Sequence, residues 1–206
     1  QFAQIPMNLL AGRSAVRHLQ TDDKPRPLSM PFVNCNDFDP AAALGKPLAA
    51  MMERFAHLGV SAAFVAWQDA GLERLPENLD DRNDWACIWG TALGGILAFE
   101  KGYREMWQNG RERVSPLSVV MGMNNAVNAH LSIQLGLGGL SMSHTVACAS
   151  STVAIGEAFR RVRSGEATVA ITGGSDATQA YAVGKAWEAM RLVAPGNVDT
   201  APAACR

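Results

Sequence analysis

The clearest pattern of large and small side chains lies over residues 140–147, where bulky positions alternate with serine, threonine and alanine. A period of two is typical of a β-strand. Residues 149–163 follow with apolar side chains at helical spacing and charged residues between them, and Gly165 ends the run. The two patterns together predict a strand that leads directly into an amphipathic helix.

The other hydrophobic patterns also alternate between helices and short strands. Residues 52–70 are apolar nearly all round, which predicts a helix that is covered on most sides. The run 85–89 predicts a buried strand, and an amphipathic helix follows from Ile96. A further helix over 125–135 and an apolar strand around Val169 continue the alternation. Strands and helices in turn indicate an α/β fold with a largely parallel sheet.

Composition agrees with a protein that folds around a core but says little about function. The chain has 206 residues, of which 48% are hydrophobic, enough for one or two domains. A formal net charge of −1 gives no electrostatic signature of nucleic-acid binding. No apolar run reaches the ~18 residues of a membrane span, and the first residues lack the layout of a secretory signal, so we expect a cytoplasmic protein.

Several common kinds of site are not indicated. The four cysteines are widely scattered and form no C-x-x-C pair, so neither a disulfide framework nor a zinc site is predicted. The glycine pairs at 94–95 and 138–139 do not extend to a dinucleotide-binding loop. Residues 173–177 read GGSDA, and the final alanine breaks the G-x-S-x-G pattern of hydrolases. We therefore expect no cofactor and no serine-hydrolase chemistry.

Cys148 is the strongest candidate for chemistry, because it lies where the predicted strand meets the predicted helix. The first N–H groups of a helix have no internal partner and the helix dipole adds about half a positive charge, so a thiolate is favoured there. The alternative is a buried, inert thiol, which we expect for Cys87 within the apolar run 85–89. His144 lies about 13 Å from Cys148 along an extended strand, too far to act as its base. The apolar strand and glycine pair over 167–174 strengthen the nucleophile hypothesis.

Five short motifs are spaced along nearly the whole chain: LLAGRS at 9–14, AWQDAGL at 66–72, GTALGG at 90–95, VSP at 114–116 and AC at 147–148. In this order and spacing they resemble the β-ketoacyl-acyl-carrier-protein synthases, the condensing enzymes of fatty-acid and polyketide synthesis. Within that family the resemblance is to the elongating type II branch.

One position departs from the family pattern at the nucleophile. The family usually has Thr-Ala-Cys, whereas here Val146 occupies the threonine position and Thr145 lies one place earlier. The departure keeps the nucleophile and admits a specialised relative, such as a polyketide or aryl-polyene synthase subunit.

The resemblance implies a thiolase-like fold, in which two similar halves are layered as α-β-α-β-α. Residues 1–206 correspond to the N-terminal part of such a domain, mostly its first βαβ half. The family's first strand and second half are not matched. The catalytic histidines, the lysine and the second oxyanion donor of the family are therefore expected outside these residues.

The resemblance also implies a reaction and the residues that serve it. Cys148 would accept an acyl chain from an acyl-carrier protein and condense it with a decarboxylating malonyl unit, and its own N–H would be one oxyanion donor. Leu93 would close the far end of the acyl pocket, although plain core packing is its alternative role. The basic residues expected to contact the acidic carrier protein are Lys46, Arg111, Arg113 and Arg191.

The resemblance further implies an assembly, and two other functions remain as alternatives. We expect a homodimer, or a heterodimer with a related synthase subunit, whose interface includes the strand 140–147. A chain-length-determining partner subunit is the first alternative, but such subunits typically lack the nucleophilic cysteine. A degradative thiolase is the second, and its cysteine stands in a different sequence context.

Overall fold

The computed structural model describes residues 4–21, 26–75 and 79–204, and the chain forms two compact units. The larger unit comprises residues 39–178, and the smaller comprises residues 1–38 and 179–206. Cys205 and Arg206 lie outside the described residues. Every element discussed for Cys148 belongs to the larger unit.

A three-stranded parallel sheet forms the centre of the larger unit. Strand β3 (Ala86–Gly90) lies between β4 (Ser141–His144) and β5 (Ala170–Gly174), and all three run in the same direction. Every residue of β3 is buried, as its uninterrupted apolar sequence predicts. The predicted α/β fold with a parallel sheet is therefore confirmed. The strand predicted over residues 140–147 is shorter than expected and covers only Ser141–His144.

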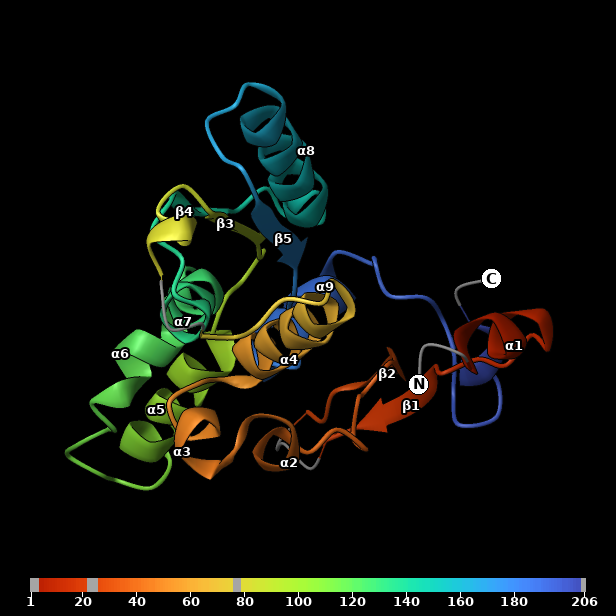
Figure 1. Cartoon of the computed structure of the whole chain (residues 1–206). Coiled ribbons are helices and arrows are strands. Elements are labelled where there is room, and N and C mark those ends of the chain that lie inside the picture. The colour runs from red at the N-terminus through yellow and green to blue at the C-terminus, as the bar shows by residue number, and fades with distance from the viewer. Residues whose placement is uncertain (1–3, 22–25, 76–78, 205–206) are drawn as a thin grey trace. The chain divides into compact units, whose positions relative to one another are not determined.

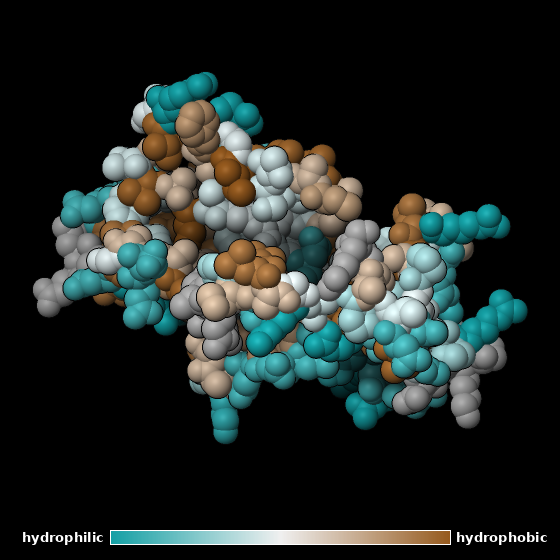
Figure 2. Space-filling view, turned by 90° about the vertical axis from the view of Figure 1, so that its right-hand side faces the viewer, coloured by the Kyte–Doolittle hydropathy of each residue, from teal (hydrophilic) through white to brown (hydrophobic). Residues whose placement is uncertain are grey.

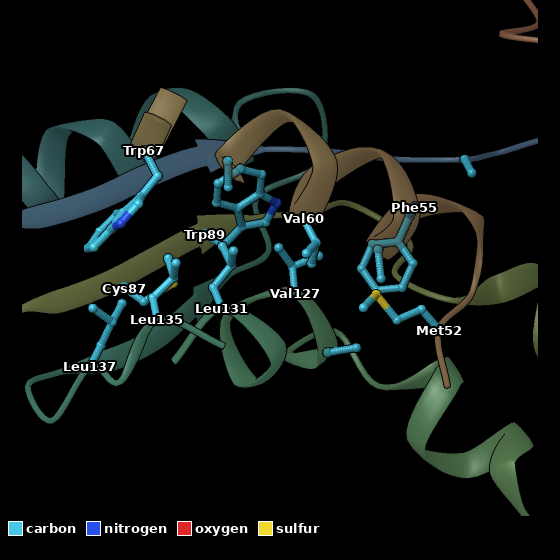
Figure 3. Close-up of a cluster of buried hydrophobic side chains, with 14 residues drawn as sticks. Met52, Phe55, Val60, Trp67, Cys87, Trp89, Val127, Leu131, Leu135 and Leu137 are labelled. Atoms are coloured by element: carbon cyan, nitrogen blue, oxygen red, sulfur yellow. The ribbon is translucent and has the colours of Figure 1, made fainter. Parts of the chain in front are cut away.

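Helices cover both faces of this sheet. Helices α4 (Arg54–Asp69) and α7 (Ala126–Leu135) pack on one face, and α8 (Ser150–Arg163) packs on the other (Figure 1). Figure 3 shows how large side chains from α4, β3 and α7 interlock on the first face. The side chains labelled there are Met52, Phe55, Val60, Trp67, Cys87, Trp89, Val127, Leu131, Leu135 and Leu137.

The opposite face of the sheet carries smaller side chains. Ala86 and Ile88 of β3 pack there against Ala154 and Ala158 of α8. The apolar residues Ile155, Phe159 and Val162 on the same helix are exposed, which differs from the predicted apolar face. Figure 2 shows brown, hydrophobic surface at the height where α8 lies in Figure 1. The small residues of α8 contact the sheet because they allow the helix backbone to approach closely.

Helix α4 also differs from its prediction. It was expected to be covered on most sides, but only the face with Phe55, Val60 and Trp67 is buried, while Ala62 and Val65 are exposed. Helix α7 ends as predicted at Gly136, whose φ of 63° is the left-handed conformation that glycine adopts readily.

Five further elements complete the described part of the larger unit: α2 (Pro40–Leu44), α3 (Lys46–Ala49), a 3-10 turn (Asp80–Arg82), α5 (Ile96–Trp107) and α6 (Leu117–Gly122). Helix α5 begins at Ile96 as predicted, and it packs against α6. Its predicted apolar face is exposed at Phe99, Tyr103 and Met106.

The smaller unit is built around an antiparallel pair of strands. It contains α1 (Gln4–Leu10), β1 (Arg17–Gln20), β2 (Ser29–Phe32), α9 (Tyr181–Ala189) and a 3-10 turn (Ala201–Ala203). Lys185 on α9 donates a hydrogen bond of 2.8 Å to the Pro27 carbonyl. Across all the described ranges, no helix is long and apolar enough to cross a membrane.

Candidate active site

Cys148 lies on a tight turn between the end of β4 and the start of α8. Ala147 has a φ of 47°, a left-handed conformation that is uncommon outside glycine. Helix α8 begins at Ser150 with Ala149 at its N-cap, so the thiol stands two residues before the first helical residue. The Cys148 side chain is exposed and forms no disulfide. The structure thus places this thiol on a surface turn, and not in the core.

The hydroxyl of Ser150 holds this turn together. It accepts a hydrogen bond of 2.8 Å from the Val146 N–H and donates one of 2.7 Å to the Ala147 carbonyl. Ser150 is only 3% exposed, so these bonds are shielded from water. Among the described residues, no acceptor is found for the N–H of Cys148. That N–H has the freedom expected of an oxyanion donor, although the role itself stays a prediction.

Two glycines allow α8 to begin directly on the sheet. A Cβ atom on Gly90 would lie 2.3 Å from the backbone carbonyl carbon of Ser150. A Cβ atom on Gly174 would lie 2.6 Å from the Cβ atom of Ser151. Side chains at either position would push the helix start away from β3 and β5. The close approach places Cys148 at the carboxyl ends of the parallel strands, where α/β folds commonly bind ligands.

Leu93 lies in the loop between β3 and α5, and Asp176 contacts that loop. The Asp176 carboxylate accepts hydrogen bonds of 3.0 Å from the Thr91 hydroxyl, the Ala92 N–H and the Leu93 N–H. Thr91 is fully buried, and its hydroxyl also accepts a hydrogen bond of 3.1 Å from the Gly94 N–H. The Leu93 side chain is 36% exposed.

Asn124 joins the Leu93 loop to the turn that carries Cys148. Gly94 has a φ of 54°, and a Cβ atom there would lie 2.1 Å from Oδ1 of Asn124. The Asn124 side-chain amide donates a hydrogen bond of 3.0 Å to the Thr145 hydroxyl, just before the turn. The structure therefore brings the segments of Leu93 and Cys148 to the same end of the sheet.

The four predicted carrier-binding residues are exposed, but they are divided between the two units. Lys46 is the first residue of α3, and Arg113 lies in the segment between α5 and α6. Arg111 forms an ion pair of 2.7 Å with Glu105. Arg191 follows α9 in the smaller unit. Their role in carrier binding stays a prediction.

The other titratable candidates are packed. Cys87 is fully buried, and burial raises the pKa of its thiol to about 12, which confirms the expected core role. Burial is the main cause that lowers the pKa of His130, and the positive charge of His57 lowers it further. His57 itself contacts the Ala49 carbonyl through Nε2 at 2.8 Å. Nε2 of His144 is buried and forms no hydrogen bond with any described residue.

An open groove of about 500 Å³ runs beside β5. Its walls include the small residues Gly59 and Ala63 of α4, and Trp89 and Ser175 near the strand ends. The Trp89 indole N–H donates a hydrogen bond of 3.0 Å to the Ser175 hydroxyl. Within the described ranges, no cluster of three or more histidine, cysteine or acidic residues could hold a metal ion.

Sequence reasoning missed the roles of Ser150, Asn124 and Asp176 in this site. The sequence does contain a signal for Asp176, because an acidic residue two positions after a Gly-Gly strand end lies at the functional edge of a parallel sheet. No local signal points to Asn124, since its partners come from distant segments.

Comparisons with a family model and with known proteins all indicate the same family. The family model described as "Beta-ketoacyl synthase, N-terminal domain" matches residues 4–204. Nodulation protein E of Rhizobium sp. (strain N33) is 40% identical over 146 residues, which are 70% of this chain and 35% of that protein. The 3-oxoacyl-[acyl-carrier-protein] synthase 2 of Staphylococcus aureus is 34% identical over 164 residues, covering 79% of this chain and 39% of that protein. The chain therefore spans less than two fifths of the length of these relatives.

Solved structures agree on the fold. One neighbour is the complex of the ketosynthase ApeO with its chain length factor ApeC from Xenorhabdus doucetiae. It superposes with a TM-score of 0.73 at 19% identity, covering 94% of this chain and 47% of the matched chain. The described residues thus adopt the thiolase-like fold of the ketosynthases.

Proposed function

This chain belongs to the β-ketoacyl synthase family, and we propose that Cys148 is the acyl-carrying nucleophile of a condensing enzyme. The enzyme elongates an acyl chain with a malonyl unit, both delivered on an acyl-carrier protein. The product is the β-ketoacyl carrier protein of fatty-acid, polyketide or aryl-polyene synthesis. The chemistry needs no cofactor.

The observation that carries this proposal is the exposed Cys148 thiol on the strained turn before α8. In the first step the thiolate attacks the thioester carbonyl of the acyl carrier, and a new thioester forms on Cys148 as the carrier thiol leaves with a proton. The N–H of Cys148 faces the developing oxyanion in this proposal. Removing one such donor costs about 3–4 kcal/mol of transition-state stabilisation in other acyl-transfer enzymes.

In the second step the carrier-bound malonyl unit loses CO2. The resulting carbanion attacks the acyl-Cys148 carbonyl, a carbon–carbon bond forms, and the Cys148 sulfur leaves and regains a proton. The enolate in this step requires hydrogen-bond donors of the kind that histidines supply. His57 and His130 are packed among helix residues, so we propose that these donors come from outside residues 1–206.

The names of two similar proteins support the choice of carrier. The Staphylococcus aureus relative is a 3-oxoacyl-[acyl-carrier-protein] synthase, and the Xenorhabdus neighbour is a ketosynthase with its chain length factor. The second of these also supports a second candidate, a chain-length-determining subunit paired with a synthase. The presence of Cys148 favours the catalytic subunit over that candidate.

Acylation of Cys148 tests the proposal. The full-length protein is incubated with an acyl-carrier protein bearing an acyl chain, and intact-mass spectrometry records the adduct. We expect one acyl group on Cys148, none in Cys148→Ala, and an unchanged adduct in the control Cys35→Ala. Addition of the malonyl carrier should then release β-ketoacyl product. An adduct that survives Cys148→Ala contradicts the assignment, and a protein that takes no acyl group but alters the product length of an active synthase is the partner subunit.

A further inference from the structure

Asp176 stands two residues after β5 and reaches back to the loop after β3. Its carboxylate accepts three hydrogen bonds of 3.0 Å, from one buried hydroxyl and two consecutive backbone N–H groups. These donors belong to Thr91, Ala92 and Leu93. A carboxylate suits this arrangement because it only accepts, and its two oxygens can serve several donors at once.

The same loop is held at its far end by other groups. The Gly94 N–H donates to the Thr91 hydroxyl at 3.1 Å, and the Gly95 N–H donates to the Gly122 carbonyl at 3.4 Å. A Cβ atom on Gly95 would lie 2.0 Å from the Met121 carbonyl oxygen. The glycines therefore fit tightly against the end of α6. Asp176 is left to hold the part of the loop that carries Leu93.

We propose that Asp176 is a positioning residue, which fixes the backbone at Leu93 and so sets the length of acyl chain that Cys148 accepts. The inference rests on the proposed function, since Leu93 can limit an acyl chain only if Cys148 carries one. It assigns to Asp176 no contact with the reacting atoms. Without the carboxylate the N–H groups of Ala92 and Leu93 lose their acceptor, and the Leu93 loop is free to move.

The chain offers a matched control, Asp84, at the opposite end of the same sheet. The Asp84 carboxylate accepts a hydrogen bond of 3.1 Å from the Thr168 N–H and another from the Thr168 hydroxyl. It ties the segment before β3 to the segment before β5, as Asp176 ties the segments after them. Asp84→Asn therefore weakens the same kind of bond in the same sheet without touching the Leu93 loop.

Amide hydrogen exchange reports whether Asp176 holds the Leu93 loop in place, and this measurement does not require the protein to be active. In the full-length protein Asp176→Asn places an amide nitrogen against the backbone N–H groups of Ala92 and Leu93, so we expect these two amides to exchange about fivefold to tenfold faster. Asp84→Asn should leave this segment unchanged. Thr91→Val, which removes the hydroxyl that donates to Asp176 and accepts from the Gly94 N–H, should accelerate exchange in the same direction. Unchanged exchange in both Asp176→Asn and Thr91→Val overturns the inference.

Competition between acyl carriers measures the consequence for specificity. Wild type and variants are offered equal amounts of short and long acyl carriers, and the adducts on Cys148 are counted by mass. We expect Asp176→Asn to raise the ratio of long to short adduct by about threefold or more, with Asp84→Asn unchanged. An unchanged ratio in Asp176→Asn, or an equal shift in Asp84→Asn, contradicts a positioning role. If wild type takes no acyl group at all, the proposed function fails, and the exchange rates still decide whether Asp176 holds the loop.

Discussion

The Ser150 hydroxyl accepts a hydrogen bond of 2.8 Å from the Val146 N–H, which lies on the other side of Cys148 in the chain. Ser150→Ala removes that acceptor and leaves the shielded Val146 N–H unpaired, whereas the Ala147 carbonyl loses the hydroxyl but keeps the backbone N–H of residue 150 as a donor at 3.2 Å. We expect a loss of about 1–3 kcal/mol in the free energy of unfolding. Acylation of Cys148 should slow as well, because the turn loses the hydrogen bonds of the Ser150 hydroxyl that hold it in place. Denaturant unfolding of the variant beside Ser151→Ala checks this, and equal stability of the two would contradict it.

Gly90→Ala should separate α8 from the sheet. The new Cβ atom would lie 2.3 Å from the Ser150 backbone, so the helix start must shift and take Cys148 with it. We expect a destabilisation of about 1–3 kcal/mol and a large fall in acylation. Gly102→Ala is the control, since its Cβ atom would meet Val114 only at 3.6 Å and replaces a glycine within α5. That change should leave stability equal or slightly higher.

The described cysteines should react in a fixed order with iodoacetamide at neutral pH. Cys148 should be labelled ahead of Cys35, which is also exposed and so controls for access. Cys87 should stay unlabelled in the folded protein, because burial raises the pKa of its thiol to about 12. Its raised pKa also means that folding stability falls as the pH rises above 9.0, the ordinary pKa of a cysteine thiol, since only the unfolded thiol then releases its proton. Peptide mass spectrometry checks the order, and preferential labelling of Cys35 would contradict the nucleophile assignment.

Charge reversal at the predicted carrier-binding residues should affect carrier-bound substrates more than small substrates. Arg113→Glu is expected to raise KM for a carrier-bound acyl group and to leave KM for a small thioester nearly unchanged. Arg111→Glu should have a smaller effect, because Glu105 already pairs with Arg111 at 2.7 Å. Lys101→Glu, the same change on exposed α5, serves as the control. Equal effects on both kinds of substrate would argue against carrier binding at this surface.

Strand β4 should lie in a dimer interface. It is an edge of the three-stranded sheet, and open edges with apolar neighbours favour pairing with another chain. Light scattering of the full-length protein at micromolar concentration should give a dimer, or a heterodimer when a related subunit is present. Leu140→Lys should weaken the dimer. Val65→Lys, a similar change at an exposed position of α4, should leave the dimer unchanged. A wild-type protein that stays monomeric both alone and with a related subunit would contradict this prediction.

Local pattern was sufficient for the elements whose side chains are buried along their whole length. Strand β3 was predicted within one residue because all its positions are buried, and the end of α7 followed from Gly136. Strands β1 and β2 were not predicted, since Arg17, His18 and Pro31 hide any apolar alternation and the strands pair through their backbones. Helices α2 and α6 were missed because they are only five and six residues long.

The candidate site likewise has one part that could be predicted from the sequence and other parts that could not. Cys148 could be placed before a helix because strand and helix periods change at that point. The hydrogen bond from the Val146 N–H to the Ser150 hydroxyl depends on the backbone conformation of the turn, including the positive φ of Ala147. The periodicity of the sequence does not predict that conformation. The hydrogen bond between Asp176 and Thr91 joins groups 85 positions apart in sequence. Contacts of that separation follow from the folded chain and cannot be found from spacing alone.

The central position of β3 has a consequence for synthesis on the ribosome. Both of its neighbours are encoded later, β4 from residue 141 and β5 from residue 170. At about 5–20 residues per second, translation of residues 91–144 takes roughly 3–11 s, and throughout that time an entirely apolar strand has no sheet partner. The nascent chain is therefore exposed to aggregation over this interval, and we expect it to depend on chaperones that shield β3 until β4 emerges.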